Sequence, residues 1–128
     1  MLDKEQIEKL TDFARSYPEI AAIYIFGSHA SGHENSKSDI DLGVLFSIAV
    51  DGFKRIDMET EISNLLMKDV DLVDMNKSSP FLRHQIYKYG KLLYHDGTDL
   101  PFTFRADSIR DYLDMDYLRM LWRTNLYG

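Results

Sequence analysis

The chain has 128 residues, 45% of them hydrophobic and 28% charged, which is the composition and length of one globular domain. Its 21 acidic residues outnumber 15 basic ones, and the net charge of −6 argues against duplex nucleic-acid binding, which needs cations against phosphate. The lack of cysteine excludes disulfides and thiolate metal sites. No apolar run approaches the roughly 20 residues of a membrane helix, and no signal-peptide layout opens the sequence, so we expect a cytoplasmic protein.

The first half of the chain is expected to form one helix and two strands. Apolar residues recur at helical spacing over 3–17, and Pro18 follows the end of this helix. Residues 20–26 are a short β-branched and aromatic run, which predicts a buried strand. The Gly- and Ser-rich segment 27–38 predicts a turn with at most one helical turn inside. Residues 39–46 alternate Asp or Gly with apolar residues, which predicts a strand with two unlike faces.

The second half is expected to alternate helices with shorter strands. The predicted elements are a helix over 52–67, a strand over 70–75, a helix over 80–89 that ends at Gly90, a short edge strand over 91–94 and a last helix over 104–126. This order predicts an α/β (α+β) fold in which a small mixed β-sheet is flanked by helices. No repeat or linker divides the chain, so residues 1–128 are expected to form a single domain.

Three aspartates are candidates for a metal site. Asp39 and Asp41 are two residues apart in a predicted strand, so both side chains point to one face. Asp71 lies in the next predicted strand and would complete an acidic triad if the two strands are neighbours. Oxygen ligands without nearby His or Cys suit Mg²⁺, and such a grouping repels itself unless cations neutralise it. The alternative is a solvated polar face, which a lone Asp-x-Asp pattern indicates more often.

The turn before the aspartates favours the metal site over the solvated face. Gly27 closes the first predicted strand and allows the backbone to approach a ligand closely, and Ser28 adds a hydroxyl donor. Backbone amides that follow such a glycine can point at an anion. A phosphate cradle at the end of one strand, beside a carboxylate pair at the start of the next, suits a metal-bound triphosphate.

The same residues resemble a known family. Gly27-Ser28, ten further residues and Asp39-Ile40-Asp41 are similar to the signature of the DNA-polymerase-beta-type nucleotidyltransferases. The stretches GSHASGHENSKSDIDLGVLF, VDLVDM and FLRHQIYKYGKLLYHDG resemble the minimal nucleotidyltransferases, or MNT proteins. The resemblance covers about residues 20–97 well and the C-terminal helix more loosely. One departure is Ser31, where many relatives carry an arginine that could bind phosphate, and Lys37 is a possible substitute.

The resemblance implies a nucleotidyltransferase nucleotide site and mechanism. Gly27 and Ser28 would bind the triphosphate of ATP, and Asp39, Asp41 and Asp71 would hold two Mg²⁺ ions, or Mn²⁺ in their place. Asp71 would also take the proton from the attacking hydroxyl. The implied partner is a HEPN toxin, because bacterial MNT proteins are often the antitoxins of HEPN–MNT toxin–antitoxin modules and adenylylate a tyrosine of the HEPN ribonuclease.

Two other functions remain open from the sequence. A binding-only antitoxin would neutralise its partner by complex formation, but such a protein has no need of three clustered carboxylates. A small-molecule nucleotidyltransferase usually carries an added helical domain that holds the acceptor, and this chain shows no such segment.

The last predicted helix carries two apolar stripes. The first is expected to pack on the sheet or on the first helix, and it contains Ile109, Tyr112, Leu113, Tyr117, Met120 and Leu121. The second stripe contains Leu118, Trp122 and Leu126 at i, i+4, i+8 spacing. A helix that is apolar on two sides either lies deep in a core or contacts two bodies, so this segment is a candidate surface for a hetero-oligomer. A single wide core face with a frayed end is the equal alternative.

Overall fold

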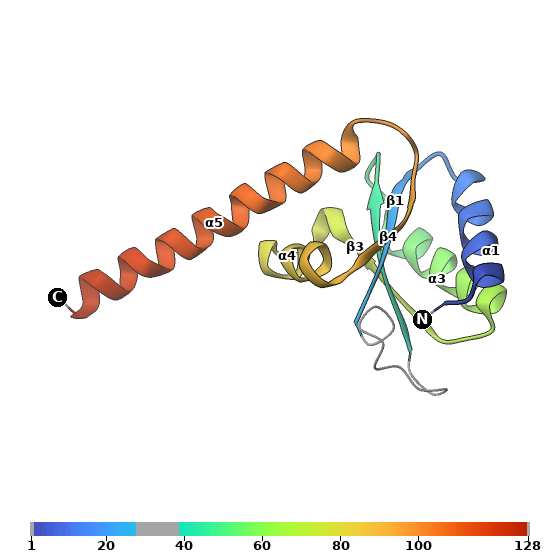
Figure 1. Cartoon of the computed structure of the whole chain (residues 1–128), viewed down its shortest axis with the longest axis horizontal. Coiled ribbons are helices and arrows are strands. Elements are labelled where there is room, and N and C mark those ends of the chain that lie inside the picture. Colours follow the sequence, from blue (N-terminus) through green and yellow to red (C-terminus); the bar gives the residue numbers. More distant parts are fainter. Residues whose placement is uncertain (1, 28–38, 128) are drawn as a thin grey trace.

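The computed structural model describes residues 2–27 and 39–127, apart from the side chains of 117, 121 and 124–127. A four-stranded sheet is flanked by helices, and one long helix extends away from it (Figure 1). In chain order the elements are α1 (Lys4–Arg15), β1 (Ile20–Phe26), β2 (Ile40–Phe46), α3 (Gly52–Leu66), β3 (Val70–Asp74), the 3-10 helix η1 (Met75–Lys77), α4 (Pro80–Tyr89), β4 (Lys91–His95) and α5 (Leu100–Tyr127).

These bounds confirm the fold class and the predicted order of helices and strands, with small shifts at the ends. The third strand stops at Asp74, whose side chain accepts a hydrogen bond from the backbone N–H of Asn76 and so begins η1. The last helix begins at Leu100 and not near residue 104. The turn predicted over 27–38 lies, apart from Gly27, outside the described residues.

The sheet is mixed, with the strand order β3-β2-β1-β4. Strand β2 pairs antiparallel with β1 on one side and parallel with β3 on the other, and β4 is an edge strand as predicted. Parallel neighbours need a crossover connection, which α3 supplies between β2 and β3. The two central strands therefore place the segment before β2, the end of β1 and the start of β3 at the same end of the sheet.

Two apolar clusters cover the two faces of the sheet, and the alternation of β2 assigns its residues to them. Ile40, Leu42 and Val44 belong to the larger cluster, which α1 and α3 complete. Leu45 belongs to the second cluster, together with Met75 and with Ile86 of α4. Because neighbouring strand residues point to opposite faces, Asp41 and Gly43 share the face of Leu45, which α4 covers.

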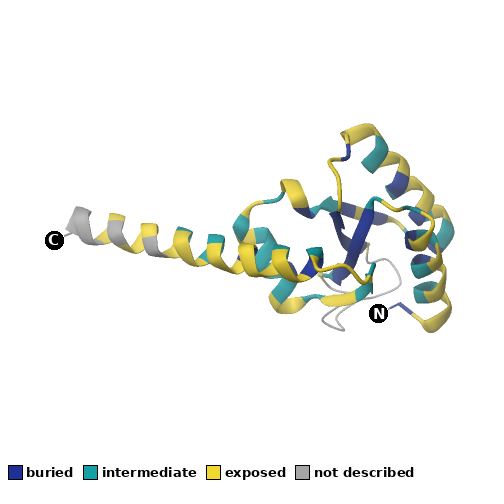
Figure 2. Cartoon of the chain, turned by 90° about the horizontal axis from the view of Figure 1, so that it is seen from above, coloured by how far each residue is buried: buried dark blue, intermediate teal, exposed yellow. Residues whose placement is uncertain are grey.

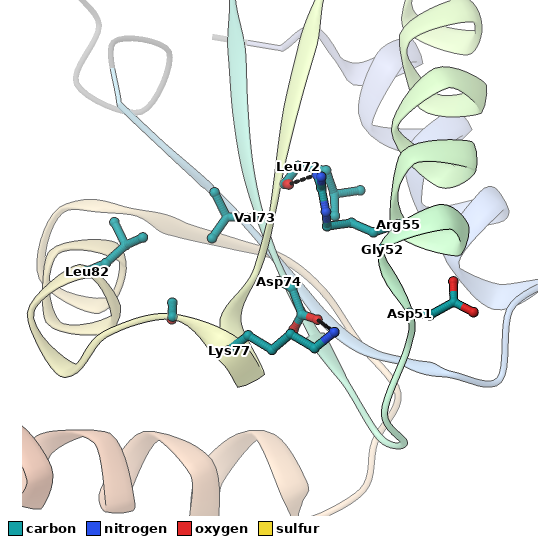
Figure 3. A pocket seen from close by; sticks show the side chains of 9 residues that line it. Asp51, Gly52, Arg55, Leu72, Val73, Asp74, Lys77 and Leu82 are labelled. Carbon is teal, nitrogen blue, oxygen red and sulfur yellow. Dashed lines mark hydrogen bonds and ion pairs between the residues drawn. The ribbon is translucent and has the colours of Figure 1, made fainter.

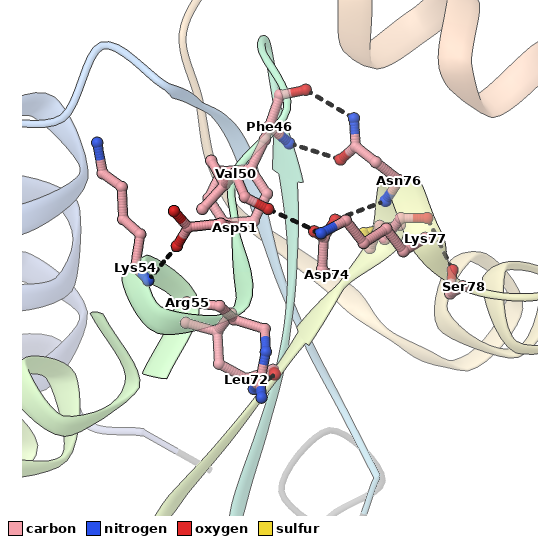
Figure 4. Close-up of polar contacts among 11 residues, drawn as sticks. Phe46, Val50, Asp51, Lys54, Arg55, Leu72, Asp74, Asn76, Lys77 and Ser78 are labelled. Carbon is pink, nitrogen blue, oxygen red and sulfur yellow. Dashed lines mark hydrogen bonds and ion pairs between the residues drawn. The ribbon is translucent and has the colours of Figure 1, made fainter. Parts of the chain in front are cut away.

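Side chains of α3 hold the outer edge of β3 through hydrogen bonds. The Arg55 guanidinium donates to the carbonyl oxygen of Leu72 at 3.0 Å (Figure 4). The Glu59 carboxylate accepts from the backbone N–H of Leu72 at 2.8 Å. The Ser63 hydroxyl accepts from the backbone N–H of Val70. These bonds satisfy backbone groups that an edge strand would otherwise expose, and they hold the start of β3 in place.

Helix α5 leaves the sheet after its first turns. Ser108 is buried and donates to the carbonyl oxygen of Phe104, whereas Ile109 and Leu113 are exposed. Most of the described part of α5 is exposed (Figure 2). Met120 of the same stripe is exposed as well, and Tyr112 stacks on His84 of α4. The prediction that this stripe packs on the sheet or on α1 is therefore wrong for these four of its residues. The physical reason is that α4 already covers this face of the sheet, so α5 packs against α4 and then runs past it (Figure 1). Within residues 2–27 and 39–127, no helix is both long and apolar enough to span a membrane.

Candidate functional site

The candidate site is a row of residues across three neighbouring strands. In the parallel pair of β2 and β3, Asp41 is the register partner of Asp71, so their Cα atoms lie on strands about 4.8 Å apart. On the other side, in the antiparallel pair, Asp41 is the partner of Phe26, the last residue of β1. The predicted neighbourhood of Asp41 and Asp71 is thus confirmed by the register.

Both carboxylates of this pair lie on the sheet face that α4 covers. The residues that flank Asp71, Val70 and Leu72, are buried in the cluster on the opposite face, and Asp71 itself is exposed. Gly43 follows Asp41 on the same face, and a Cβ on it would lie 3.2 Å from the tip of Ile86 in α4. The absence of a side chain at Gly43 therefore lets α4 lie close to the sheet directly beside Asp41.

Gly27 makes the closest approach to the central carboxylate. Its φ of +73° belongs to the left-handed region, which favours glycine. A Cβ on this residue would overlap Oδ2 of Asp41. The backbone at Gly27 can therefore lie against this carboxylate only because the residue has no side chain.

The remaining predicted site residues either lie directly beside the undescribed residues 28–38 or are among them. Asp39 directly precedes β2 and is exposed, and the backbone N–H of the next residue, Ile40, bonds to the carbonyl oxygen of Asp69. Ser28 lies outside the described residues, as do Ser31 and Lys37. Within the described chain, no three or more His, Asp or Glu side chains form a group that could by itself hold a metal ion.

Arg83 and His84 of α4 contact α5, and Tyr87 of the same helix contacts β1. Arg83 donates to the buried Ser108 hydroxyl at 3.3 Å and lies 3.7 Å from the Asp111 carboxylate. The His84 ring stacks on Tyr112 with centroids 3.8 Å apart. Tyr87 packs edge-on against the ring of Tyr24 in β1, and burial raises the pKa of its hydroxyl well above the ordinary value. Position on a helix face gives no signal for such contacts between two helices.

A separate open pocket of about 420 Å³ lies toward the far end of β3 from Asp71 (Figure 3). Its lining includes Arg55 and Lys77, which could in principle bind an anion. Both cations are engaged in the fold, however, because Arg55 donates to Leu72 and Lys77 donates to the carbonyl oxygen of Val50 at 2.8 Å. We therefore assign no anion site to this pocket.

Comparison with known proteins assigns the family. The model of the polymerase beta nucleotidyltransferases matches residues 8–99, which include the whole row of Gly27, Asp41 and Asp71. The chain belongs to this nucleotidyltransferase family. A Methanocaldococcus jannaschii protein named for protein adenylyltransferase activity is 34% identical over 73 residues, which cover 57% of this chain and 85% of that protein. The protein adenylyltransferase MntA of Aphanizomenon flos-aquae is 27% identical over 92 residues, covering 64% of this chain and 61% of MntA.

Solved structures extend the similarity over almost the entire chain. A crystal structure of a toxin–antitoxin complex with AMP-PNP contains a chain that is 29% identical, with a TM-score of 0.79 over 99% of this chain and 100% of that chain. A structure of the tri-AMPylated Shewanella oneidensis HEPN toxin with its MNT antitoxin contains one that is 26% identical, with a TM-score of 0.77 and the same coverage. Both matches include α5, which lies beyond the region that the family model matches.

A pair of glycine substitutions tests the contact between the turn and the carboxylate. Gly27→Ala should lower stability by about 1–2 kcal/mol from left-handed backbone strain, and should also displace Asp41 and abolish metal-dependent ATP binding. Gly97→Ala is the matched control, because its φ is +83° and nothing lies within 4 Å of an added Cβ. Thermal unfolding and calorimetric titration with ATP and Mg²⁺ check both effects. Equal ATP affinity in the two variants would contradict the role of Gly27.

Proposed function

We propose that this chain is the antitoxin of a HEPN–MNT pair, acts in the cytoplasm and transfers AMP from ATP to a tyrosine hydroxyl of its HEPN toxin. The observation that carries the proposal is the row in which Gly27 lies over Asp41 and Asp41 lies beside Asp71. The relatives support the adenylyl transfer, because several are named protein adenylyltransferases. The structural neighbours support the partner, because one holds an AMPylated HEPN toxin with its MNT antitoxin.

The donor set at this end of the sheet fits magnesium. Asp39, Asp41 and Asp71 offer carboxylate oxygens only, which is the chemistry that Mg²⁺ or Mn²⁺ prefers. Mg²⁺ is usually held by one or two protein carboxylates together with phosphate oxygens, so a site completed by ATP needs no closed cage of protein ligands. Two bound ions would neutralise charge on the attacking and leaving oxygens. We therefore assign these three aspartates as the ligands of the metal.

The roles in nucleotide binding and proton transfer follow from the positions of Gly27, Asp41 and Asp71 in the row across the three strands. Gly27 and the amides that follow it, with Ser28, would hold the triphosphate beside Asp41, since backbone N–H groups of such a turn can point at an anion. Asp71 is exposed on the outer strand, where an acceptor hydroxyl can reach its carboxylate and give up its proton. The acceptor oxygen then attacks the α-phosphorus, the bond to pyrophosphate breaks, and AMP is transferred.

The form of α5 favours a macromolecular acceptor over a small molecule. The helix extends from the body as a rod, and its described part is mostly exposed (Figures 1 and 2). Large apolar side chains are exposed in its outer half. Leu118 is 57% exposed and Trp122 is 67% exposed, so the alternative in which this stripe is core does not hold for these two residues. Exposed apolar residues in a row on one helix are typical of a protein-binding surface. We assign this stripe to the HEPN partner.

Substitution of Asp71, the carboxylate on the outer strand β3, tests catalysis separately from ATP binding. Asp71→Asn should keep most of the ATP affinity and lose transfer to the partner by about 10²–10⁴-fold, because a general base acts on the hydroxyl and contributes little to ground-state binding. Asp39→Asn/Asp41→Asn should instead lose metal-dependent ATP binding itself. Calorimetry and a rate assay with labelled ATP measure the two properties. Wild-type turnover of Asp71→Asn would exclude the carboxylate from catalysis.

Substitution of Trp122 tests whether the exposed apolar stripe of α5 binds the partner. Trp122→Ala should weaken complex formation by about 2 kcal/mol or more, as truncation of an interface tryptophan commonly does, and should leave ATP binding and thermal stability of the isolated chain unchanged. Phe102→Ala is the matched control, because Phe102 is an equally exposed aromatic residue in the first turns of the same helix. Affinity for the HEPN protein is measured by biolayer interferometry. If Phe102→Ala weakens the complex and Trp122→Ala does not, the partner contacts the base of α5.

A further inference from the structure

The backbone directly after Asp71 is held from outside the sheet by a side chain of α3. The Glu59 carboxylate accepts from the backbone N–H of Leu72 at 2.8 Å. This N–H belongs to the peptide group that joins Asp71 to Leu72, and a peptide group is planar and stiff. The opposite edge of β3 is held by its parallel pairing with β2. Glu59 therefore fixes the peptide plane that begins at the Cα of Asp71, and with it the direction of the Asp71 side chain.

Arg55 completes a two-point contact with Leu72. Its guanidinium donates to the carbonyl oxygen of Leu72 at 3.0 Å (Figure 4) and lies 3.4 Å from the Glu59 carboxylate. The side chains of Arg55 and Glu59 are only 32% and 28% exposed, so neither is an ordinary solvated surface charge. The ion pair aligns Glu59, and it balances the charge of Glu59, so that the contact adds no net charge beside Asp71.

Helix α3 gives this ion pair a rigid base. The helix begins at Asp51, whose side chain accepts from the backbone N–H of Lys54 at 2.8 Å. Met58 and Ile62, on either side of Glu59 along the helix, are buried in the larger apolar cluster. The core on one face of the sheet thus determines the position of the Asp71 carboxylate on the other face.

We propose that Glu59, aligned by Arg55, is a positioning residue for adenylyl transfer, which acts through the Asp71–Leu72 peptide to hold the Asp71 carboxylate at the attacking hydroxyl. The inference rests on the proposed function, since it assumes that Asp71 acts in the transfer. Residues that orient the ligands or acids of an active site commonly contribute about 10- to 100-fold to activity. The alternative is that Glu59 only stabilises the edge strand, without any specific effect on Asp71.

A double-mutant cycle distinguishes these two roles. The rate of AMP transfer to the HEPN protein, at saturating ATP and Mg²⁺, is compared for wild type, Glu59→Ala, Asp71→Asn and the variant with both changes. Glu59→Ala should lower the rate by about 10-fold or more and keep the wild-type affinity for ATP. In the Asp71→Asn background the same change should lower the rate no further, because residues that act as one unit are not additive. Glu59→Gln keeps an oxygen acceptor for Leu72 and should restore most of the rate.

Asn76→Ala is the matched control. The Asn76 amide bonds to both the N–H and the carbonyl oxygen of Phe46 at 2.9 Å, so it makes a two-point contact of the same kind at the opposite end of β3 from Asp71. Its loss should lower the unfolding temperature and leave the transfer rate unchanged when all variants are assayed well below unfolding. Hydrogen exchange adds a measurement that needs no activity, since exchange of the Leu72 N–H should accelerate in Glu59→Ala and not in Asn76→Ala.

Each other outcome has a definite meaning. An unchanged rate in Glu59→Ala, when Asp71→Asn loses transfer, would overturn the positioning role and leave the proposed function intact. The same proportional loss of rate in the Asp71→Asn background, or an equal loss in Asn76→Ala, would also overturn it, because Glu59 would then act on the fold as a whole. Wild-type turnover in Asp71→Asn, or no transfer by the wild type, defeats the proposed role of Asp71 and the positioning role together.

Discussion

The close approach of the Gly27 backbone to the Asp41 carboxylate is the constraint on which the site depends. Asp41 stands in a central strand with a neighbour on each side, and a side chain on Gly27 would overlap its carboxylate. Under the proposed function, a triphosphate bound beside Gly27 would lie next to this carboxylate. Gly43, on the same sheet face, also leaves space, because its lack of a side chain allows α4 to pack close to the sheet. Two glycines thus clear the space around one aspartate on the sheet face that α4 covers.

The rest of the fold keeps this row in register. The outer strand β3 contributes the second carboxylate, and its edge is held by Arg55, Glu59 and Ser63 of α3. At the opposite end of β3, the amide of Asn76 bonds to both the N–H and the carbonyl oxygen of Phe46 in β2 (Figure 4). A carboxylate on an edge strand is only as well placed as the strand, so the contacts with α3 fix the position of Asp71.

Much of the site could be predicted from the sequence because its signals are local. Alternation in 39–46 assigns Asp41 and Ile40 to opposite faces, and the structure confirms this through the burial of Ile40. What local pattern cannot give is the position of one helix relative to another. The stripe on α5 indicates an apolar face but not its partner, and exposed Leu113 shows that the sheet is not that partner.

The central claim is that the chain modifies its partner covalently and does not only bind it. Intact-mass spectrometry of the HEPN protein, after incubation with this chain, ATP and Mg²⁺, tests the claim most directly. We expect the HEPN protein to gain whole AMP units on a tyrosine, and to gain none when Mg²⁺ is chelated. A HEPN ribonuclease that loses its activity in the complex while its mass stays unchanged would contradict the account and establish a binding-only antitoxin.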